Sequence, residues 1–71
     1  MMRVKHEPAA RLRVLMAERD VNVNELADRS GVSCATVTAL RTGRVRKPQN
    51  ETAYRIARAL GAKVDSIWPD I

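Results

Sequence analysis

The sequence has few aromatic residues and almost no cysteine. Its 71 residues include no Phe, one Tyr and one Trp, and Cys34 is the single cysteine. One cysteine excludes an intrachain disulfide and a metal site built from several cysteines. Strand-forming residues are not concentrated anywhere, and no segment alternates apolar and polar residues with a period of two. The composition therefore favours an all-α fold, and we expect no metal site.

Long apolar segments are missing as well. No apolar run approaches the ~20 residues that a membrane span requires, and the first residues, MMRVKHEP, lack the apolar core of a signal peptide. We therefore expect a cytoplasmic protein with no membrane partner. One histidine, one cysteine and no converging carboxylates offer little from which to build a catalytic site. The chain is accordingly predicted not to be an enzyme and to use neither a cofactor nor a small-molecule substrate.

Positive charge is in excess. Lys and Arg number 13 against 8 Asp and Glu, which gives a formal net charge of +5. This sign of charge favours a polyanionic partner, either a nucleic acid or an anionic membrane surface. Many small proteins are basic without such a partner. The charge by itself therefore does not decide whether a polyanionic partner exists.

The length allows one small domain. Residues 1–7 are expected to form a flexible basic arm, because Arg3, Lys5 and His6 give it positive charge and free termini are usually disordered. Residues 8–71 are expected to form one helical domain, since closely packed helices are the simplest way to stabilise a small core. This domain reaches the last residues of the sequence, and we expect no separate ligand-sensing domain.

Apolar residues recur with the helical period in several segments. Leu12, Leu15, Met16 and Arg19 form the first stripe, behind Pro8, which suits the first turn of a helix. The predicted helices span residues 8–19, 23–30, 34–42 and 51–60. A last turn or short helix follows in KVDSIW, and it is expected to fold back onto the core through Val64, Ile67 and Trp68.

Helix start and stop signals mark the boundaries of these segments. Asn22, followed three residues later by Glu25, has the spacing of a capping box. Gly31 stands where a helix ends in a left-handed residue, and Ser33 is the expected cap of the next helix. Asn50 is the expected cap of the fourth helix.

The segments 23–30 and 34–42, joined by a tight turn at Gly31, form a predicted helix-turn-helix. Such a motif lays its second helix in the major groove of DNA while the first crosses the backbone. The sequence RTGRVRK begins at the end of the second helix, and its cations would contact the phosphate walls of the groove. An ordinary helical hairpin followed by a solvated run of charge is the alternative. The density of cations beside this one helix favours the DNA-binding interpretation.

Residues 11–68 resemble the phage repressor and Cro-like helix-turn-helix family, also called the xenobiotic-response-element family. The shared features are NELADRSGVS, the exit LRTGR, the loop proline, RIARALG and the terminal VDSIW. The resemblance implies a compact, lambda-repressor-like bundle of five helices that binds double-stranded DNA, often as a homodimer on a palindromic operator. It implies a sequence-specific transcriptional regulator, such as a small repressor, that reads the major groove with helix 34–42.

The resemblance also implies which residues contact DNA. In the family, positions along the second helix of the motif supply base and phosphate contacts, and the start of the first helix supplies a phosphate contact. Together with the cations that follow the motif, the candidate DNA-binding residues here are Asn22, Asn24, Ser33, Cys34, Ala35, Thr36, Thr38, Arg41, Thr42, Arg44, Arg46 and Lys47.

The base-reading positions depart from the family pattern. Gln, Arg or Asn are frequent there because each can form two hydrogen bonds to one base edge, whereas Cys34, Ala35 and Thr38 are small. Small residues permit close approach to the groove and contact with thymine methyl groups. Specificity is therefore either modest or carried by DNA shape and the flanking arginines. Val23 also replaces a glutamine that commonly reaches a phosphate, although Asn22 and Asn24 beside it are able to do so.

A paired departure concerns Met16 and Arg41. The family often has Arg at the first position and Glu at the second, joined as a partly buried ion pair. Here Met16 is expected to pack and Arg41 to face solvent or phosphate. Losing both partners of a buried pair is gentler than losing one, so the double change indicates a working variant.

Other classes of function stay open. The small residues at the base-reading positions also suit a protein-interaction module, or the antitoxin partner of a toxin, that reuses this fold with weak or no specific DNA binding. The sequence does not separate a repressor from an activator. Any dimer surface is expected around residues 64–68 and the exposed part of helix 51–60.

Overall fold

The structure is a computed structural model that describes residues 7–71, and over this range it contains helices and no strands. The helices are α1 (Pro8–Glu18), α2 (Val23–Ser30), α3 (Cys34–Thr42), α4 (Asn50–Leu60) and α5 (Val64–Ile67). The prediction of an all-α bundle of five helices with a helix-turn-helix is confirmed. None of the helices in residues 7–71 has the length and apolar character needed to cross a membrane.

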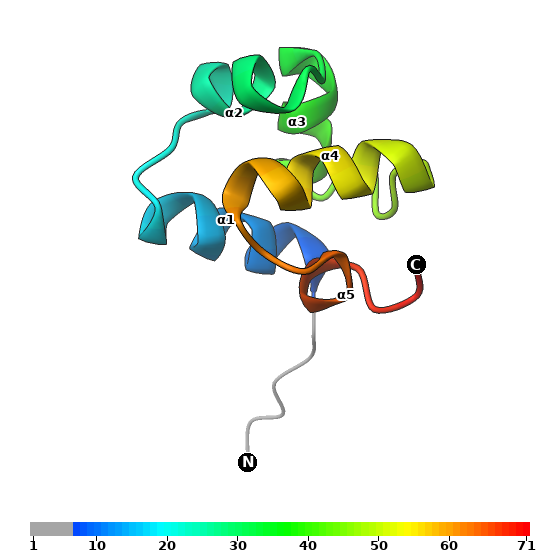
Figure 1. Ribbon diagram of the computed structural model, residues 1–71. Helices are drawn as coiled ribbons and strands as arrows, with labels where there is room; N and C mark the ends of the chain where they lie inside the picture. The colour runs from blue at the N-terminus through cyan, green and yellow to red at the C-terminus, as the bar shows by residue number, and fades with distance from the viewer. Residues whose placement is uncertain (1–6) are drawn as a thin grey trace.

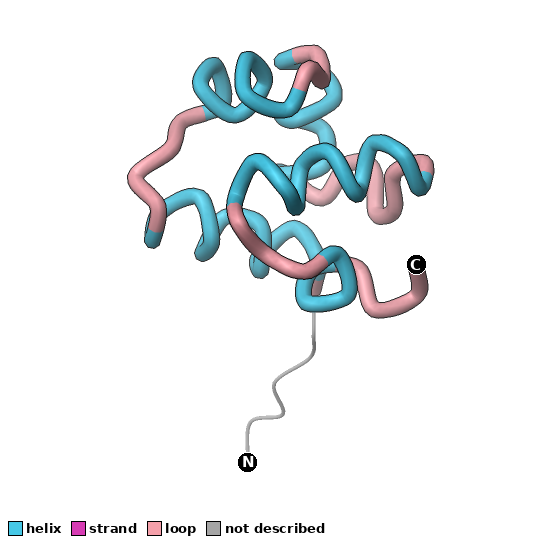
Figure 2. Tube along the Cα trace, in the orientation of Figure 1, coloured by secondary structure: helices cyan, strands magenta, loops and turns pink. Residues whose placement is uncertain are grey.

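The helices enclose a single core. α1 packs against α3 and α5, α2 packs against α3 and α4, and α4 packs against α5. In Figure 1, α2 and α3 lie at the top, α1 and α5 lie at the bottom, and α4 crosses in front between them. Figure 2 shows the loops that join these layers, including the loop between α3 and α4. The helix-turn-helix therefore occupies one end of the molecule.

The core consists of apolar residues from all five helices, together with Val21 just before α2 and Trp68 just after α5. Its members are Leu12, Leu15, Met16, Val21, Leu26, Ala27, Val37, Leu40, Ala53, Ile56, Ala57, Leu60, Ile67 and Trp68. Fully burying one large aliphatic side chain contributes about 1.5–3 kcal/mol. Ile67 and Trp68 pack inside as expected and are therefore withdrawn from the surface on which we expected a dimer contact.

The first and fourth helices differ by one residue from the predicted bounds. α1 ends at Glu18, and Arg19 instead donates a hydrogen bond from Nε to the carbonyl oxygen of Leu60, at 2.6 Å. α4 begins at Asn50, so Gln49 is its N-cap and forms no side-chain cap hydrogen bond. The expectation that Asn50 caps α4 was wrong, because the extended backbone of the N-cap lies at Gln49 and Asn50 is already helical.

The predicted basic arm lies outside the described residues except at Glu7. Glu7 has extended backbone geometry, and its carbonyl oxygen accepts the Arg11 N–H at 2.9 Å. It therefore acts as the first backbone acceptor of α1, while Pro8 occupies the first turn as expected.

Candidate nucleic-acid interface

The turn between α2 and α3 is fixed by hydrogen bonds from short polar residues. The capping box at the start of α2 is present, with the Asn22 side chain accepting from Glu25 N at 2.8 Å and Glu25 Oε1 accepting from Asn22 N at 3.0 Å. The hydroxyl of buried Ser30 donates to the Leu26 carbonyl at 2.6 Å and accepts from Val32 N at 3.2 Å. Gly31 has a φ of +74°. The Ser30 contacts and the left-handed Gly31 therefore shape the turn between α2 and α3, whereas the capping box fixes the start of α2.

α3 presents two opposite faces. Val37 and Leu40 are buried, and they attach the helix to the core. The side of α3 that faces away from the core is exposed and carries only small side chains. We call this set the exposed face of α3: Cys34, Ala35, Thr38 and Thr42.

Several predicted hydroxyl groups already have partners within α3. Ser33 caps the helix by accepting from Thr36 N at 3.2 Å, and its hydroxyl donates to Thr36 Oγ1 at 2.9 Å. The Thr42 hydroxyl donates to the Thr38 carbonyl at 2.9 Å. Thr36 is half-buried. The hydroxyl of Thr38, by contrast, is exposed and forms no hydrogen bond within the described part of the chain, so it is free to contact a ligand.

A side-chain contact connects the starts of α2 and α3. The Cys34 thiol donates to Asn24 Oδ1 at 3.3 Å, and both residues are exposed. The contact leaves the amide NH2 group of Asn24 available as a donor. The structure thus brings together two predicted residues from different helices at the edge of the exposed face.

Asn22, Asn24 and Arg41 line one hollow of about 560 Å³. Met16 forms part of its wall and is 4% exposed, so the prediction that Met16 packs is confirmed. Arg41 is half-buried. The hollow also contains Arg13 of α1, which the sequence argument did not select. The sequence did hold a signal for Arg13: it lies three residues before Met16, and residues three apart share a helix face.

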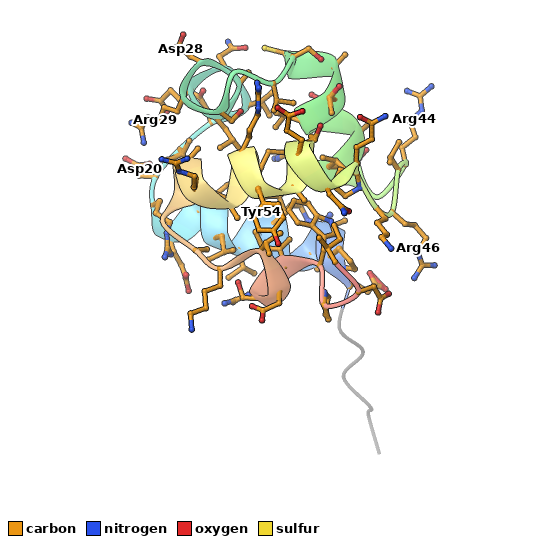
Figure 3. All side chains as sticks on the ribbon, turned by 45° about the vertical axis from the view of Figure 1, so that its right-hand side comes forward. Asp20, Asp28, Arg29, Arg44, Arg46 and Tyr54 are labelled. Carbon is orange, nitrogen blue, oxygen red and sulfur yellow. The ribbon has the colours of Figure 1, made fainter. Side chains whose placement is uncertain are left out.

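The loop after α3 carries the densest positive charge. Arg44, Arg46 and Lys47 are exposed, and within residues 7–71 none of them forms an ion pair. Figure 3 shows Arg44 and Arg46 extending outward from this loop, away from the helices. The loop is anchored by the Val45 N–H, which donates to the Ala39 carbonyl at 3.1 Å, and by buried Pro48. The cations are therefore displayed beside α3 on a fixed backbone.

A second hollow of about 440 Å³ lies between α3 and the start of α4. Its apolar lining includes Ala35, Ala39, Val45 and Pro48, and Val45 is 44% exposed. Its polar lining consists of Thr36, Gln49 and Thr52. One side of α3 is thus bordered by a surface that combines methyl groups with a few hydrogen-bonding side chains.

The family is established by comparison with known proteins. The family model of the Cro/C1-type HTH DNA-binding domain matches residues 11–67. This chain belongs to that family. Its shared fold and the turn geometry described above make it a DNA-binding helix-turn-helix domain of the kind found in regulators. No curated relative matches the chain.

One similar solved structure is a larger protein. It is Streptomyces albus HEPD with substrate 2-hydroxyethylphosphonate and Fe(II) bound, and it is 34% identical with a TM-score of 0.79. The match covers 94% of this chain and 15% of the HEPD chain. The likeness therefore concerns one part of the HEPD chain, about the size of this helical domain.

Proposed function

We propose that this protein is a sequence-specific, double-stranded DNA-binding transcriptional regulator that reads the major groove with α3. The observation that carries the proposal is the exposed face of α3, bordered by cations that have no ion-pair partner in residues 7–71. A solvated surface helix more commonly mixes charges of both signs. A helix of small residues between unpaired cations suits a groove with phosphate walls.

The chemistry of base recognition follows from the small side chains. The major groove is about 12 Å wide and admits one helix. Ala35 and the neighbouring methyl groups of Ala39 and Val45 offer apolar contacts to thymine methyl groups, and the Thr38 hydroxyl offers a hydrogen bond to a base edge. Arg44, Arg46 and Lys47 would bind phosphates and fix the register of the helix. Specificity then depends on apolar contacts and on DNA shape.

We further propose that the protein acts as a small repressor, as a homodimer on a palindromic operator. Two copies would place their α3 helices one DNA turn apart, about 34 Å. Because Ile67 and Trp68 are buried, the candidate surface for contact between two copies is the groove between α4 and α5. In this groove Tyr54 is 53% exposed and lies beside Arg58, Lys63 and Asp65. Opposite charges within this groove would permit pairing between identical copies.

A selection of bound duplexes from a random pool tests the proposal. We expect enrichment of a thymine-containing motif, repeated with inverted symmetry at a spacing near one DNA turn. Affinity for random duplex should fall steeply as salt rises, because each phosphate contact releases counterions. Recovery of no motif together with an absence of salt-dependent binding would contradict the proposal.

A protein-interaction module or an antitoxin is the second candidate. It is favoured by the scarcity of free hydrogen-bonding side chains on the exposed face of α3. The occurrence of this fold as 15% of the HEPD chain shows that it also stands as part of a longer chain. The salt dependence discriminates, since a module that binds only proteins would show no steep slope with duplex DNA.

A further inference from the structure

We propose that Arg13 of α1 is a further DNA-binding residue, which forms with Arg41 a seat for one backbone phosphate of duplex DNA. This inference rests on the proposed function and adds to the interface a contact that lies outside the helix-turn-helix. α1 would contribute a phosphate contact and would couple that contact to the position of α3.

The two arginines meet at the hollow of about 560 Å³ described above. Arg13 Nη1 donates a hydrogen bond to the main-chain carbonyl of Arg41 at 2.7 Å. This contact joins the middle of α1 to the last turn of α3. The residues that the argument uses are Arg13, Met16, Asn22, Val23, Asn24 and Arg41, and all of them line the hollow.

The charges in this hollow are uncompensated. No Asp or Glu lines it, and within residues 7–71 neither Arg13 nor Arg41 forms an ion pair. Two like charges at one site repel each other, and an anion placed between them turns the repulsion into attraction. The guanidinium group is also the side chain best matched to the two oxygens of a phosphate.

The wall opposite the arginines supplies further donors. Within the described residues, the N–H groups of Val23 and Asn24 in the first turn of α2 form no backbone hydrogen bond. Such groups favour anions. None of the carboxylates that neighbour lining residues in the sequence lines the hollow, and Glu25 is held at the helix start by its hydrogen bond from Asn22 N at 3.0 Å.

The contact from Arg13 to Arg41 also explains how the seat would position α3. A guanidinium has five N–H donors, and Arg13 uses one nitrogen for the Arg41 carbonyl. The others can bind a phosphate while the first holds the end of α3. A phosphate in the hollow would then fix the depth of α3 in the groove through one side chain that is hydrogen-bonded to the end of that helix.

The test measures how affinity for a random-sequence duplex depends on salt in the full chain. Arg13→Gln removes the charge, Arg13→Lys retains it, and Arg29→Gln is a matched control for net charge at exposed Arg29 in the last turn of α2. We expect Arg13→Gln to flatten the slope of log affinity against log salt by about 0.9 units, the value for one phosphate. Arg13→Lys should restore most of the slope, and Arg29→Gln should leave it unchanged.

Thermal melting of each variant shows whether a change in slope comes from a lost phosphate contact or from unfolding. If Arg13→Gln unfolds the protein, Arg41→Gln provides the second variant, because it retains the carbonyl that Arg13 binds, and it should flatten the slope equally. Duplex binding by the parent with an unchanged slope in the arginine variants would overturn this inference alone. The same slope change in Arg29→Gln would overturn it as well. Absence of salt-dependent duplex binding by the parent would overturn the proposed function together with it.

Discussion

Gly31 fixes the turn of the helix-turn-helix through its backbone conformation. Its φ of +74° lies in the left-handed region, and an added Cβ would meet only Arg55 Nη1, at 3.5 Å. The cost of a side chain is therefore backbone strain and not a steric clash. We expect Gly31→Val to lower the free energy of unfolding by about 1 kcal/mol or more.

Gly31→Asn is the matched control, because asparagine tolerates the left-handed region better than a β-branched residue does. Chemical denaturation of both variants measures the difference. Equal stability of the valine and asparagine variants would show that strain at this residue does not hold the turn.

Ala35 and Val37 lie on opposite faces of α3, so the same substitution should act differently at each. Ala35 is exposed, and Ala35→Gln should change stability by no more than about 0.5 kcal/mol. A glutamine there can form two hydrogen bonds with adenine, worth about 1–3 kcal/mol of discrimination. We expect the preferred binding site to change, as read from duplex selection.

Val37→Gln is the opposite case. Val37 is 0% exposed, and a glutamine would place an unpaired amide in the core and destabilise or unfold the domain. Thermal melting compares the two variants. Unfolding by Ala35→Gln, or an unchanged site preference in that variant, would mean that α3 is oriented differently in the complex.

The helices could be predicted wherever their signals are local. The bounds of α2 and α3 follow from Asn22, Ser33 and the glycines that end each helix, because a cap and a left-handed residue act within one turn. The start of α4 could not be predicted in this way. Its N-cap, Gln49, forms no side-chain cap hydrogen bond, so no local capping signal marks it. The end of α1 likewise lacks such a signal, since its C-cap is Arg19 and not a glycine.

The loop between α3 and α4 should act through charge alone. Replacing Arg44, Arg46 and Lys47 together by alanine removes three exposed cations that have no ion-pair partner in residues 7–71. We expect weaker binding to all duplexes alike and a salt slope flatter by up to roughly three units. Titration of selected and random duplexes at several salt concentrations measures both effects.

The control for this loop is a triple variant with the same change in net charge elsewhere, at Arg11, Arg29 and Arg55, none of which lines the proposed dimer groove. Its slope should stay close to that of the parent. Equal slopes in the two triple variants would assign the effect to net charge and not to contacts made by the loop.

At the scale of the whole molecule, the sequence identified the motif but not its full surroundings. The exposed face of α3 and the loop cations follow from helical periodicity and from local charge, and both were predictable. The hollow of Arg13 and Arg41 was not, because its residues come from three helices whose packing brings them together. The Asn24 contact with Cys34 was not predictable either, because it depends on the angle at which α2 and α3 pack.

The central claim is that α3 and its flanking cations form the DNA-binding surface. The most direct measurement is an NMR titration of backbone amides with a random-sequence duplex at about 50 mM salt, where non-specific binding is strong. We predict the largest shift changes in α3, in the loop 44–47 and at the start of α2, with the smallest around Tyr54 and Lys63. Shift changes concentrated on α4 and α5, or none at all, would contradict the account.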